Sequence, residues 1–499
     1  MQLRFYIFVI LTGLGLSNCR NTVVFNGEPV ELVFSQDTVL LDTVFTGLGS
    51  STRLLKVYNP SAENINVDRV FLGRGASSFY RMNVDGVSGR SLDNLEILAG
   101  DSAYLFIEIT PDAGGANEMV YEDSIVFENG PYSQSVRLIT AVWDAYYHFP
   151  NRVLTIAQPE PYPDIKIPYG ILPCNSHWSN DKPHVIYGYA VVDSACSLTI
   201  DEGTQVHVHN GGGIWIYKDG LLRVDATATS SPDNLSNPVI FQGDRLEPGY
   251  EWVPGQWGGV LGGIFMMEST AGPQILKNTI IKNATTGIRL DSAAELELEN
   301  VIVTHSSRVN FYGGFGQAEL VNTLLGPAGV YSFYGLGGQY NVSNSTILNG
   351  WTFSGREGTA LGLSNYFEDG NGVRYGRDLL ANFTGSIIDG TLDNEVGLAI
   401  DGSASFNVRF DHSALIIDPN PDGGHYSLED TIMFSGTNLY NGFWNYVEGP
   451  VLEGAGFEYV PDSVSVLHGR IGPSPQTPPY DMHGTLRNAL ITVGASNPL

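Results

Sequence analysis

Apolar residues recur at a fixed interval along residues 276–348. Four stretches share the order apolar, asparagine, apolar, and their successive asparagines are 22 residues apart. A fixed period of this length indicates a repeat architecture in which each unit stacks on the previous one. The runs are short and β-branched, with Gly, Asn and Ser between them and no helical periodicity, so each repeat is predicted to be one coil of short β-strands. The shared polar column consists of Asn278, Asn300, Asn322 and Asn344.

A coil of this length with apolar columns and an asparagine column resembles that of the right-handed parallel β-helix. In that fold, stacked asparagine side chains hydrogen-bond along the stack, which implies a structural ladder at these four positions. The apolar columns continue at 383–388 and 410–415, where the asparagine column is lost. We therefore predict a right-handed parallel β-helix over residues 165–499. Residues 481–487 and 493–495 resemble the closing coil of such solenoids and predict a C-terminal cap.

Longer alternating runs precede the repeats. Between residues 30 and 142, strands of four to eight residues are separated by Gly, Asn and Pro turns, which is typical of an all-β sandwich. Residues 42–45 and 58–60 resemble immunoglobulin-like modules of exported bacterial proteins. We expect an immunoglobulin-like β-sandwich over residues 20–143, a Tyr- and Pro-rich linker over 144–164, and an all-β fold throughout.

The charge of the chain restricts its partners. Fifty-three acidic residues against 25 basic ones give a formal net charge of −28. Such a surface repels polyanions, so neither nucleic acid nor an anionic lipid surface is an expected partner.

The first 19 residues read as a targeting segment. Arg4 supplies a positive charge, and residues 5–16 form an apolar run too short for a permanent membrane span. Residues 16–19 (Leu-Ser-Asn-Cys) resemble the lipobox of bacterial lipoproteins, with Asn18 as a departure from the small residue usual there. The resemblance implies a signal peptide over residues 1–19, lipidation of Cys19 and anchoring of the protein in the outer membrane. The alternative is an ordinary cleaved signal with an incidental cysteine.

Two further cysteines, Cys174 and Cys196, are 22 residues apart. In an oxidising compartment they would form a disulfide, which stabilises by about 3 kcal/mol for a loop of this length. Two buried thiols in adjacent coils are the alternative.

Three motifs resemble an uncharacterised family of lipoproteins from Bacteroidetes-type bacteria. They are residues 186–193 (Ile-Tyr-Gly-Tyr-Ala-Val-Val-Asp), 242–247 (Gln-Gly-Asp-Arg-Leu-Glu) and 254–259 (Pro-Gly-Gln-Trp-Gly-Gly). The resemblance extends with gaps over most of residues 20–499. It implies a cell-envelope location and nothing about activity.

Catalytic signatures of polysaccharide-cleaving β-helices are weak in this chain. A hydrolase requires paired carboxylates, and no Asp-Asp occurs anywhere in the sequence. A lyase would require Ca²⁺ and a basic residue, for which Arg289, Arg308, Arg374 and Arg377 are available. No carboxylate column accompanies them in the regular coils, so catalytic residues are not assigned and no cofactor other than Ca²⁺ is considered.

A histidine pair and a tryptophan pair could each be functional or structural. His207 and His209 share one face of a strand and would begin a Zn²⁺ site if a neighbouring coil supplied a third ligand. Solvent-facing or capped histidines in a turn are favoured instead, and no metal site is predicted. Trp252 and Trp257 lie in a Gly-rich bend, where they are expected to pack a corner of the coil.

The candidate ligand-binding surface is the insertion of residues 351–377, the longest interruption of the repeat before the C-terminal region. Long loops on a rigid solenoid commonly carry function, and aromatic rings beside polar groups suit sugar rings. The alternative is that the aromatics only fold the loop onto the coils. The candidate residues are Trp351, Tyr366, Phe367, Asp369, Tyr375 and Arg377.

Three functions compete on this basis. The first is a cell-envelope lipoprotein whose solenoid binds a glycan or an envelope protein without catalysis. The second is a polysaccharide lyase or glycoside hydrolase that acts on a polymer lying along the solenoid. The third is a structural or adhesive rod. We favour the first.

Overall fold

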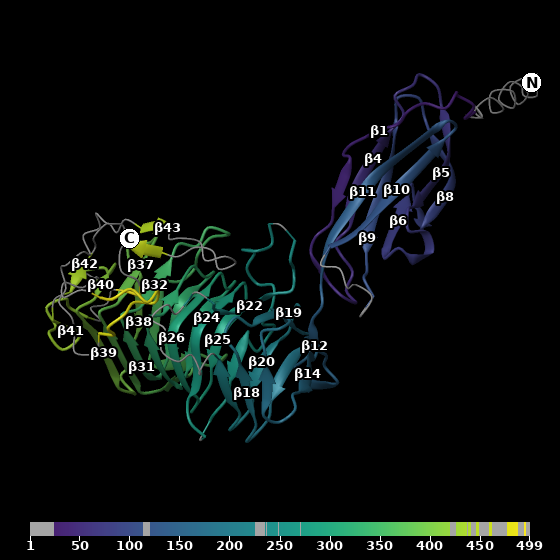
Figure 1. Ribbon diagram of the computed structural model, residues 1–499. Helices are drawn as coiled ribbons and strands as arrows, with labels where there is room; N and C mark the ends of the chain where they lie inside the picture. Colours follow the sequence, from purple (N-terminus) through teal and green to yellow (C-terminus); the bar gives the residue numbers. More distant parts are fainter. Residues whose placement is uncertain are drawn as a thin grey trace, which may run out of the picture. The chain divides into compact units, whose positions relative to one another are not determined.

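The computed structural model describes residues 24–112, 120–224, 235, 237–247, 249–269, 271–419, 426–436, 438–440, 446–448, 459–461, 477–487 and 494–495. The expected signal peptide and Cys19 lie outside these residues. The chain is all-β, and its described part contains a single short 3-10 helix, η1 (Gly75–Ser77). It divides into two compact units, Met1–Asp144 and Ala145–Leu499, which we describe separately (Figure 1).

The first unit consists of two sheets that enclose one apolar core. Their strands alternate, so that every second residue is buried between the sheets. Tyr80 also joins the sheets: its hydroxyl lies 2.7 Å from Thr140 Oγ1 and donates to the Tyr121 carbonyl. One sheet has the order β1 (Val33–Phe34), β4 (Arg53–Tyr58), β9 (Ser102–Ile109), β6 (Tyr80–Val84) and β7 (Val87–Gly89). The other contains β2 (Thr38–Leu40), β11 (Tyr132–Trp143), β10 (Val120–Asn129), β5 (Ile65–Leu72) and β8 (Ser91–Ile97), with β3 (Val44–Phe45) on β11.

The second unit contains two long sheets whose strands are almost all parallel, as their alignment in Figure 1 shows. Each strand pairs with the equivalent strand of the next coil, for example Leu276 with Leu298 and Leu298 with Leu320. The ten-stranded sheet has the order β13 (Arg152–Ile156), β14 (Ile165–Ile171), β17 (Tyr189–Val192), β20 (Gly213–Ile216), β23 (Ile264–Met266), β25 (Thr286–Leu290), β27 (Val309–Gly314), β30 (Tyr331–Leu336), β33 (Leu361–Ser364) and β38 (Val396–Ala399).

The nineteen-stranded sheet follows the same stack. Its strands in order are β12 (Tyr146–His148), β15 (Ser176–Trp178), β16 (His184–Ile186), β18 (Ser197–Ile200), β19 (Gln205–Val208), β21 (Leu221–Val224), β22 (Val239–Gly243), β24 (Gln274–Lys282), β26 (Glu295–Thr304), β28 (Gln317–Val321), β29 (Leu324–Leu325), β31 (Gly338–Ser343), β32 (Thr346–Asn349), β36 (Leu379–Thr384), β37 (Ile387–Gly390), β39 (Phe406–Asp411), β40 (Ala414–Leu415), β41 (Phe434–Ser435) and β42 (Leu439–Tyr440). Two hairpins stand apart: β34 (Tyr366–Glu368) with β35 (Arg374–Gly376), and β43 (Tyr446–Glu448) with β44 (Tyr459–Pro461).

Residues expected to form a linker contribute to these sheets. Strand β12 pairs in parallel with β16, and β13 pairs antiparallel with β14. The second unit therefore begins directly after Asp144, without a separate linker.

The space between the two sheets is filled by one apolar cluster that runs along the whole stack. Leu276, Leu298 and Leu320 line one inner wall, and Ile288, Phe311 and Phe333 line the opposite one. Phe311 and Phe333 stack with ring centroids 4.8 Å apart. Burial of these columns in every coil is the main stabilising interaction of the unit.

The asparagine column occupies a sharp turn. Asn278, Asn300, Asn322 and Asn344 all have a positive φ, between 45° and 54°. Asn300 Nδ2 donates to Asn278 Oδ1 (3.3 Å) and Asn322 Nδ2 donates to Asn300 Oδ1 (3.2 Å). Asparagine tolerates this left-handed conformation better than most residues because its short side-chain amide can hydrogen-bond to the nearby backbone. Both the hydrogen bonds between side chains and the left-handed backbone conformation therefore favour asparagine at this turn.

The turn persists where asparagine is lost. The equivalent positions Gly385, His412 and Gly436 also have positive φ values of 60°, 50° and 69°. Glycine adopts this left-handed conformation at low energetic cost, and histidine is found in it more often than most residues. The residues at this turn must therefore adopt a positive φ, and the hydrogen bonds between asparagine side chains are an additional interaction.

A second polar column follows the first by one residue. Ser345 Oγ accepts a hydrogen bond from the backbone N–H of Thr323, Ser386 Oγ from that of Ser345, and Ser413 Oγ from that of Ser386. Each hydroxyl in turn donates to the carbonyl two residues before it. All these side chains are buried, so the hydroxyl column satisfies backbone N–H groups that the turn removes from the β-ladder.

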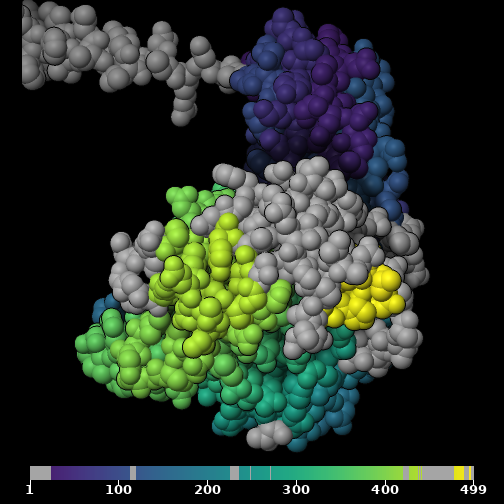
Figure 2. Space-filling model, turned by 90° about the vertical axis from the view of Figure 1, so that its left-hand side faces the viewer, coloured from purple at the N-terminus to yellow at the C-terminus, as the bar shows by residue number. Residues whose placement is uncertain are grey.

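The C-terminal residues lie along the side of the stack. Met482 and Ala495 pack on Ile280, Ile302 and Leu324, which face away from the inner core. Figure 2 shows this segment, in yellow, beside the teal and green coils. Arg487 is buried and donates to Asn322 Oδ1 (3.0 Å) and to the Gly494 and Ala495 carbonyls. The described residues of the expected cap therefore cover a flank of the middle coils, which differs from the closing coil that the sequence suggested.

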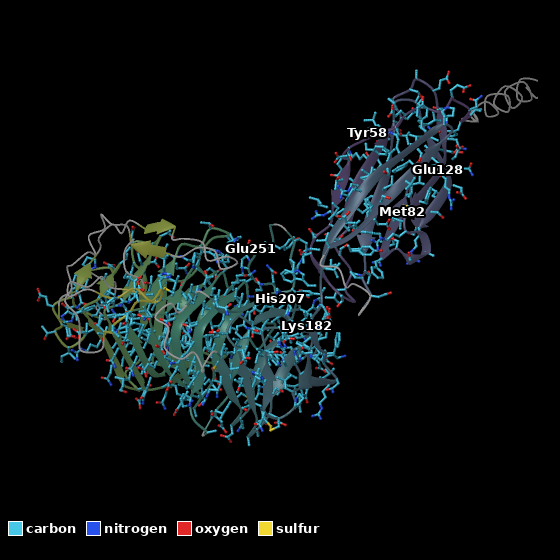
Figure 3. The ribbon with its side chains drawn as sticks, viewed as in Figure 1. Tyr58, Met82, Glu128, Lys182, His207 and Glu251 are labelled. Carbon is cyan, nitrogen blue, oxygen red and sulfur yellow. A yellow bond between two sulfur atoms is a disulfide. The ribbon has the colours of Figure 1, made fainter. Side chains whose placement is uncertain are left out.

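Cys174 and Cys196 form a disulfide in the structure (Figure 3). They lie one coil apart, before the aligned strands β15 and β18. The bond therefore joins neighbouring coils near the start of the stack.

We predict that Asn300→Ala lowers the free energy of unfolding by about 2–4 kcal/mol, because alanine strains the left-handed turn and both ladder bonds are lost. Asn300→Gly should cost less, since glycine accepts a φ of +54° without strain. Urea unfolding of the two variants measures the difference. Equal losses would show that the backbone conformation does not select the residue.

Candidate functional site

An outward-facing column of aromatic residues runs along the ten-stranded sheet. Five successive strands, β20, β23, β25, β27 and β30, each place one residue in it, and each residue is the parallel partner of the next. We call this set the aromatic column: Trp215, Phe265, Arg289, Tyr312 and Tyr334.

The local sequence explains why these residues face outward. Trp215 lies between Ile214 and Ile216, which are both fully buried in the inner core. Phe265, Arg289, Tyr312 and Tyr334 likewise follow a buried residue of that core. Because side chains alternate along a strand, the residue between two inward positions must point away from the core.

The rings of the column contact one another from coil to coil. Trp215 and Phe265 have centroids 6.1 Å apart, and Tyr312 and Tyr334 stack at 5.7 Å with an interplanar angle of 20°. Tyr331 adds a further ring 4.9 Å from Tyr334. Phe265 is covered, whereas the other four members of the column are half-buried. The column therefore offers a partly exposed apolar surface several coils long.

Arg289 interrupts the rings with a cation. Its guanidinium carbon lies 4.9 Å from the Phe265 centroid and 6.0 Å from that of Tyr312. Within the described part of the chain it forms no ion pair and no hydrogen bond, and its Nε is buried without an acceptor. Cation–π attraction to the two rings holds the side chain in the column.

Burial also changes the acidity of the tyrosines. Loss of solvent raises the pKa of Tyr334 to about 12, with Tyr331, Tyr312 and Tyr366 adding unfavourable charge interactions. The pKa of Tyr312 is raised for the same main reason and is partly lowered again by Arg289. Both hydroxyls are therefore neutral hydrogen-bond donors near neutral pH.

Five of the six insertion residues proposed from the sequence form one hairpin, β34–β35. Phe367 and Tyr375 stack at 4.9 Å, and Asp369 Oδ2 accepts from the Tyr375 hydroxyl at 3.2 Å. The Arg377 guanidinium lies 5.2 Å from the centroids of both Phe315 and Phe367. These contacts fold the hairpin onto the coils. Tyr366 is close enough to Tyr334 to affect its pKa, so the hairpin lies near the end of the aromatic column.

Trp351 is placed elsewhere. It is buried, donates from Nε1 to Ser354 Oγ (2.9 Å) and packs 5.1 Å from Phe353. Among the described residues, no ring contact or hydrogen bond joins it to the hairpin. The insertion is also anchored by a buried ion pair between Arg356 Nη2 and Glu395 Oε1 (2.5 Å). Trp351 thus belongs to the packing of the insertion.

The two candidate metal-binding histidines have different surroundings. His207, labelled in Figure 3, is fully buried, and its Nδ1 lies 3.3 Å from the Gly243 carbonyl. His209 is half exposed and its Nδ1 lies 2.7 Å from Asp244. The described residues contain no group of three His, Cys, Asp or Glu side chains placed to hold a metal ion. Of the two expected alternatives, solvent-facing or capped, His209 faces solvent, whereas His207 is buried with its ring beside a backbone carbonyl.

The two bend tryptophans pack on the same coil. Trp257 is fully buried and donates from Nε1 to the Lys282 carbonyl at 2.8 Å. The Lys282 ammonium lies 4.5 Å from the Trp252 centroid and 3.5 Å from Glu251. Burial lowers the pKa of Lys282, while Glu251 opposes that shift.

The four arginines considered for a lyase do not share one environment. Arg289 lies in the aromatic column, and Arg308 is exposed on a neighbouring coil. Arg374 pairs with Glu368 at 3.1 Å and covers the Tyr366 ring, while Arg377 covers Phe367.

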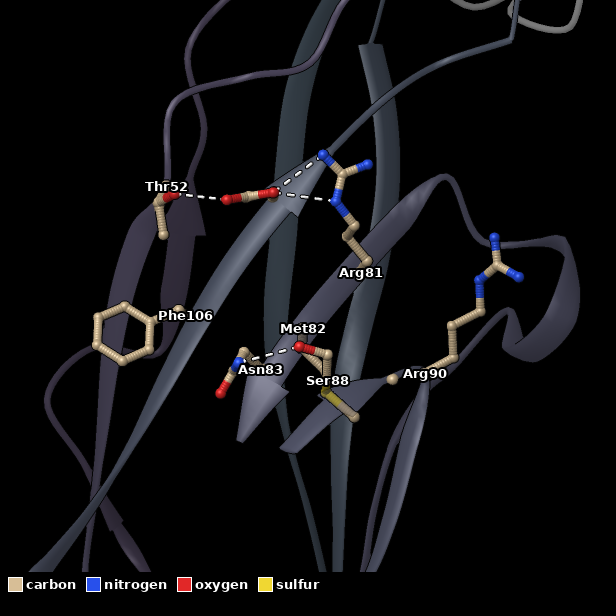
Figure 4. A pocket seen from close by; sticks show the side chains of 9 residues that line it. Thr52, Arg81, Met82, Asn83, Ser88, Arg90 and Phe106 are labelled. Atoms are coloured by element: carbon tan, nitrogen blue, oxygen red, sulfur yellow. Dashed lines mark hydrogen bonds and ion pairs between the residues drawn. The ribbon is translucent and has the colours of Figure 1, made fainter. Parts of the chain in front are cut away.

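The first unit contains a separate hollow of about 810 Å³ on the outer face of its first sheet (Figure 4). The polar side chains that line it already hydrogen-bond to one another. Glu108 accepts from Arg81 Nε (2.9 Å) and from Thr52 (2.6 Å), and Asn83 donates to Ser88. The exposed Phe106 and Arg90 complete the lining.

The aromatic column was not predicted from the sequence, although the sequence contains a signal for it. The triplets 214–216, 264–266, 288–290, 311–313 and 333–335 all place Trp, Phe, Arg or Tyr after a large apolar residue. Their spacings vary because loops of different length separate the coils. Only the register of the strands shows that the central residues align.

Comparison with known proteins gives no family. No family model matches the chain, and no curated protein sequence matches it. Solved structures resemble parts of it at low scores. A family 123 glycoside hydrolase from Clostridium perfringens matches with 12% identity over 23% of this chain and 26% of its own, at a TM-score of 0.17. PapD-like domain 7 of human CEP192 matches with 10% identity over 26% and 96%, also at 0.17.

A protein of unknown function from Porphyromonas gingivalis matches with 14% identity over 30% of this chain and 57% of its own, at a TM-score of 0.18. This chain thus spans about a quarter of the length of the glycoside hydrolase. Among the helices of the described residues, none is long and apolar enough to cross a membrane.

Three buried histidines and the half-buried His148 link the stability of the second unit to pH. His148 and His184 lie against each other, Nε2 to Nδ1, at 3.0 Å, and both stack on Trp178. Burial lowers the pKa of each to about 4, as it does for His207 and His305. In the unfolded chain these groups titrate near 6.5.

We predict that the second unit loses stability as the pH falls from about 6.5 to about 4. In this window the unfolded chain binds protons that the folded chain excludes, so each histidine contributes a slope of at most about 1.4 kcal/mol per pH unit. The double variant His148→Gln/His184→Gln should flatten this slope, with the exposed His177→Gln as control. Urea unfolding at a series of pH values measures it, and a wild-type stability that is constant across the window would contradict the prediction.

Proposed function

We propose that this chain is a lipoprotein of the bacterial cell envelope whose second unit is a right-handed parallel β-helix that binds an extended glycan along the aromatic column without cleaving it. In this proposal Cys19 carries the lipid anchor in the outer membrane, and the first unit is an immunoglobulin-like module. The protein would then belong with the Bacteroidetes-type exported lipoproteins that its motifs resemble.

The proposed β-helix is supported by the register of the coils. Equivalent residues 22 positions apart pair in parallel, one apolar cluster fills the space between the sheets, and each coil from Asn278 to Gly436 turns at a left-handed residue. Each feature is expected of a solenoid that grows along one axis. The immunoglobulin-like module is supported by two sheets of mainly antiparallel strands that share one core.

The observation that carries the binding proposal is the aromatic column itself. Sugar rings have apolar faces that stack on aromatic side chains and hydroxyl groups that bond to nearby polar groups. Here one residue per coil repeats at the strand spacing of about 4.8 Å, which suits a polymer lying along the stack. The neutral Tyr312 and Tyr334 hydroxyls supply donors beside the rings.

We predict that Tyr334→Ala raises the Kd for a bound glycan about fivefold, and Tyr312→Ala/Tyr334→Ala about 30-fold, because each ring contributes on the order of 1 kcal/mol. Glycan-array screening followed by calorimetry on the best oligosaccharide measures these changes. Tyr132→Ala, an exposed tyrosine of the first unit, is the matched control and should bind like the wild type.

Two results would contradict the proposal. Binding that is unchanged in the double tyrosine variant would remove the aromatic column as the site. Turnover of a polysaccharide by the wild-type protein, abolished by replacing one arginine or aspartate, would establish the enzymatic alternative.

We predict that labelled palmitate is incorporated into the wild-type protein in a bacterial host and not into Cys19→Ala, because a thiol at this position is the acceptor for lipidation. Membrane fractionation should show the variant released from the membrane. Equal labelling of both proteins would end the lipoprotein assignment.

A further inference from the structure

We propose that Arg289 is the specificity-determining residue of the aromatic column and binds the carboxylate or sulfate group of an acidic sugar in the glycan. This inference rests on the proposed glycan-binding function and adds the class of ligand. With this role for Arg289, the aromatic column would distinguish acidic from neutral polymers, which a purely apolar stacking surface could not do.

The position of Arg289 supports this role. Its guanidinium lies between Phe265 and Tyr312, in register with rings on both sides along the stack. A sugar that continues the stack at this coil would bring its ring substituents next to the cation. The planar guanidinium matches a carboxylate or sulfate with two parallel hydrogen bonds, which a neutral hydroxyl cannot replace equally well.

The surrounding charges support it as well. The chain has about twice as many acidic as basic residues, and several other arginines on strand faces are paired with carboxylates, such as Arg69 with Asp93 and Arg137 with Glu122. Arg289 has no such partner among the described residues. A half-buried cation surrounded by rings interacts strongly with an anion because little water competes.

An acidic polysaccharide fits this arrangement better than a peptide carboxylate. Two coils on each side of the cation carry a ring, and all of these rings except the covered Phe265 are half-buried, so they would contact a polymer of ring-shaped units on both sides. A single aspartate or glutamate side chain would use only the Arg289 position and leave the rest of the column without a role.

The experiment compares matched ligands on the full-length protein in detergent. Uronate-containing oligosaccharides are paired with their carboxyl-reduced forms, and sulfated ones with their desulfated forms, so that each pair differs only at the acidic group. We expect the wild type to bind at least one acidic form ten or more times tighter than its neutral partner. Arg289→Met should remove this preference and keep the weaker neutral binding, and Arg289→Lys should restore part of it. Arg308→Met removes an exposed arginine and should leave the preference intact.

The outcomes separate this inference from the function on which it rests. Glycan binding that depends on Tyr312 and Tyr334 but shows no charge preference, or an equal loss of both ligand forms in Arg289→Met with an unchanged melting temperature, would overturn the role of Arg289 alone. Absence of glycan binding would overturn both proposals. Binding of acidic peptides only would do the same and assign the column to a protein partner.

Discussion

The left-handed backbone conformation at one turn of the coils from Asn278 to Gly436 fixes the register on which this part of the second unit depends. The residue at this turn separates two strand segments, as Asn278 does in β24 and Asn300 in β26, and each segment pairs with the next coil. If the turn slipped by one residue, the inward and outward sets of side chains would exchange places. Both the apolar interior and the outward aromatic column therefore rely on the small set of residues that tolerate a positive φ.

The sequence predicted this architecture well where the coils have constant length. Four asparagines at one interval indicated parallel stacking of the coils, and the structure joins three of them, with Asn300 bonded to both Asn278 and Asn322. The continuation through Gly385 and His412 was recognised only by its apolar columns. Backbone conformation, rather than residue type, unites that column, and it is not visible in a pattern of amides.

The proposed binding surface was harder to predict for a related reason. The insertion attracted attention because its aromatics are close in sequence, yet Trp351 is buried beside Phe353 while Tyr366 and Tyr375 belong to a hairpin. The successive residues of the aromatic column lie 22 to 50 positions apart, as Trp215 and Phe265 do, and their alignment depends on loops of unequal length. Alignment across coils is a property of the folded stack, and sequence proximity is a poor guide to it.

The return of the C-terminal residues to the middle of the stack has a consequence for biosynthesis. Ile280, Ile302 and Leu324 are covered by Met482 and Ala495, which are made more than 150 residues later. During translation this apolar row stays open to solvent until the end of the chain leaves the ribosome, even though the coils that carry it are already complete. An export pathway that keeps the chain unfolded until synthesis ends would protect this row from aggregation, and an early stop codon would leave it permanently exposed.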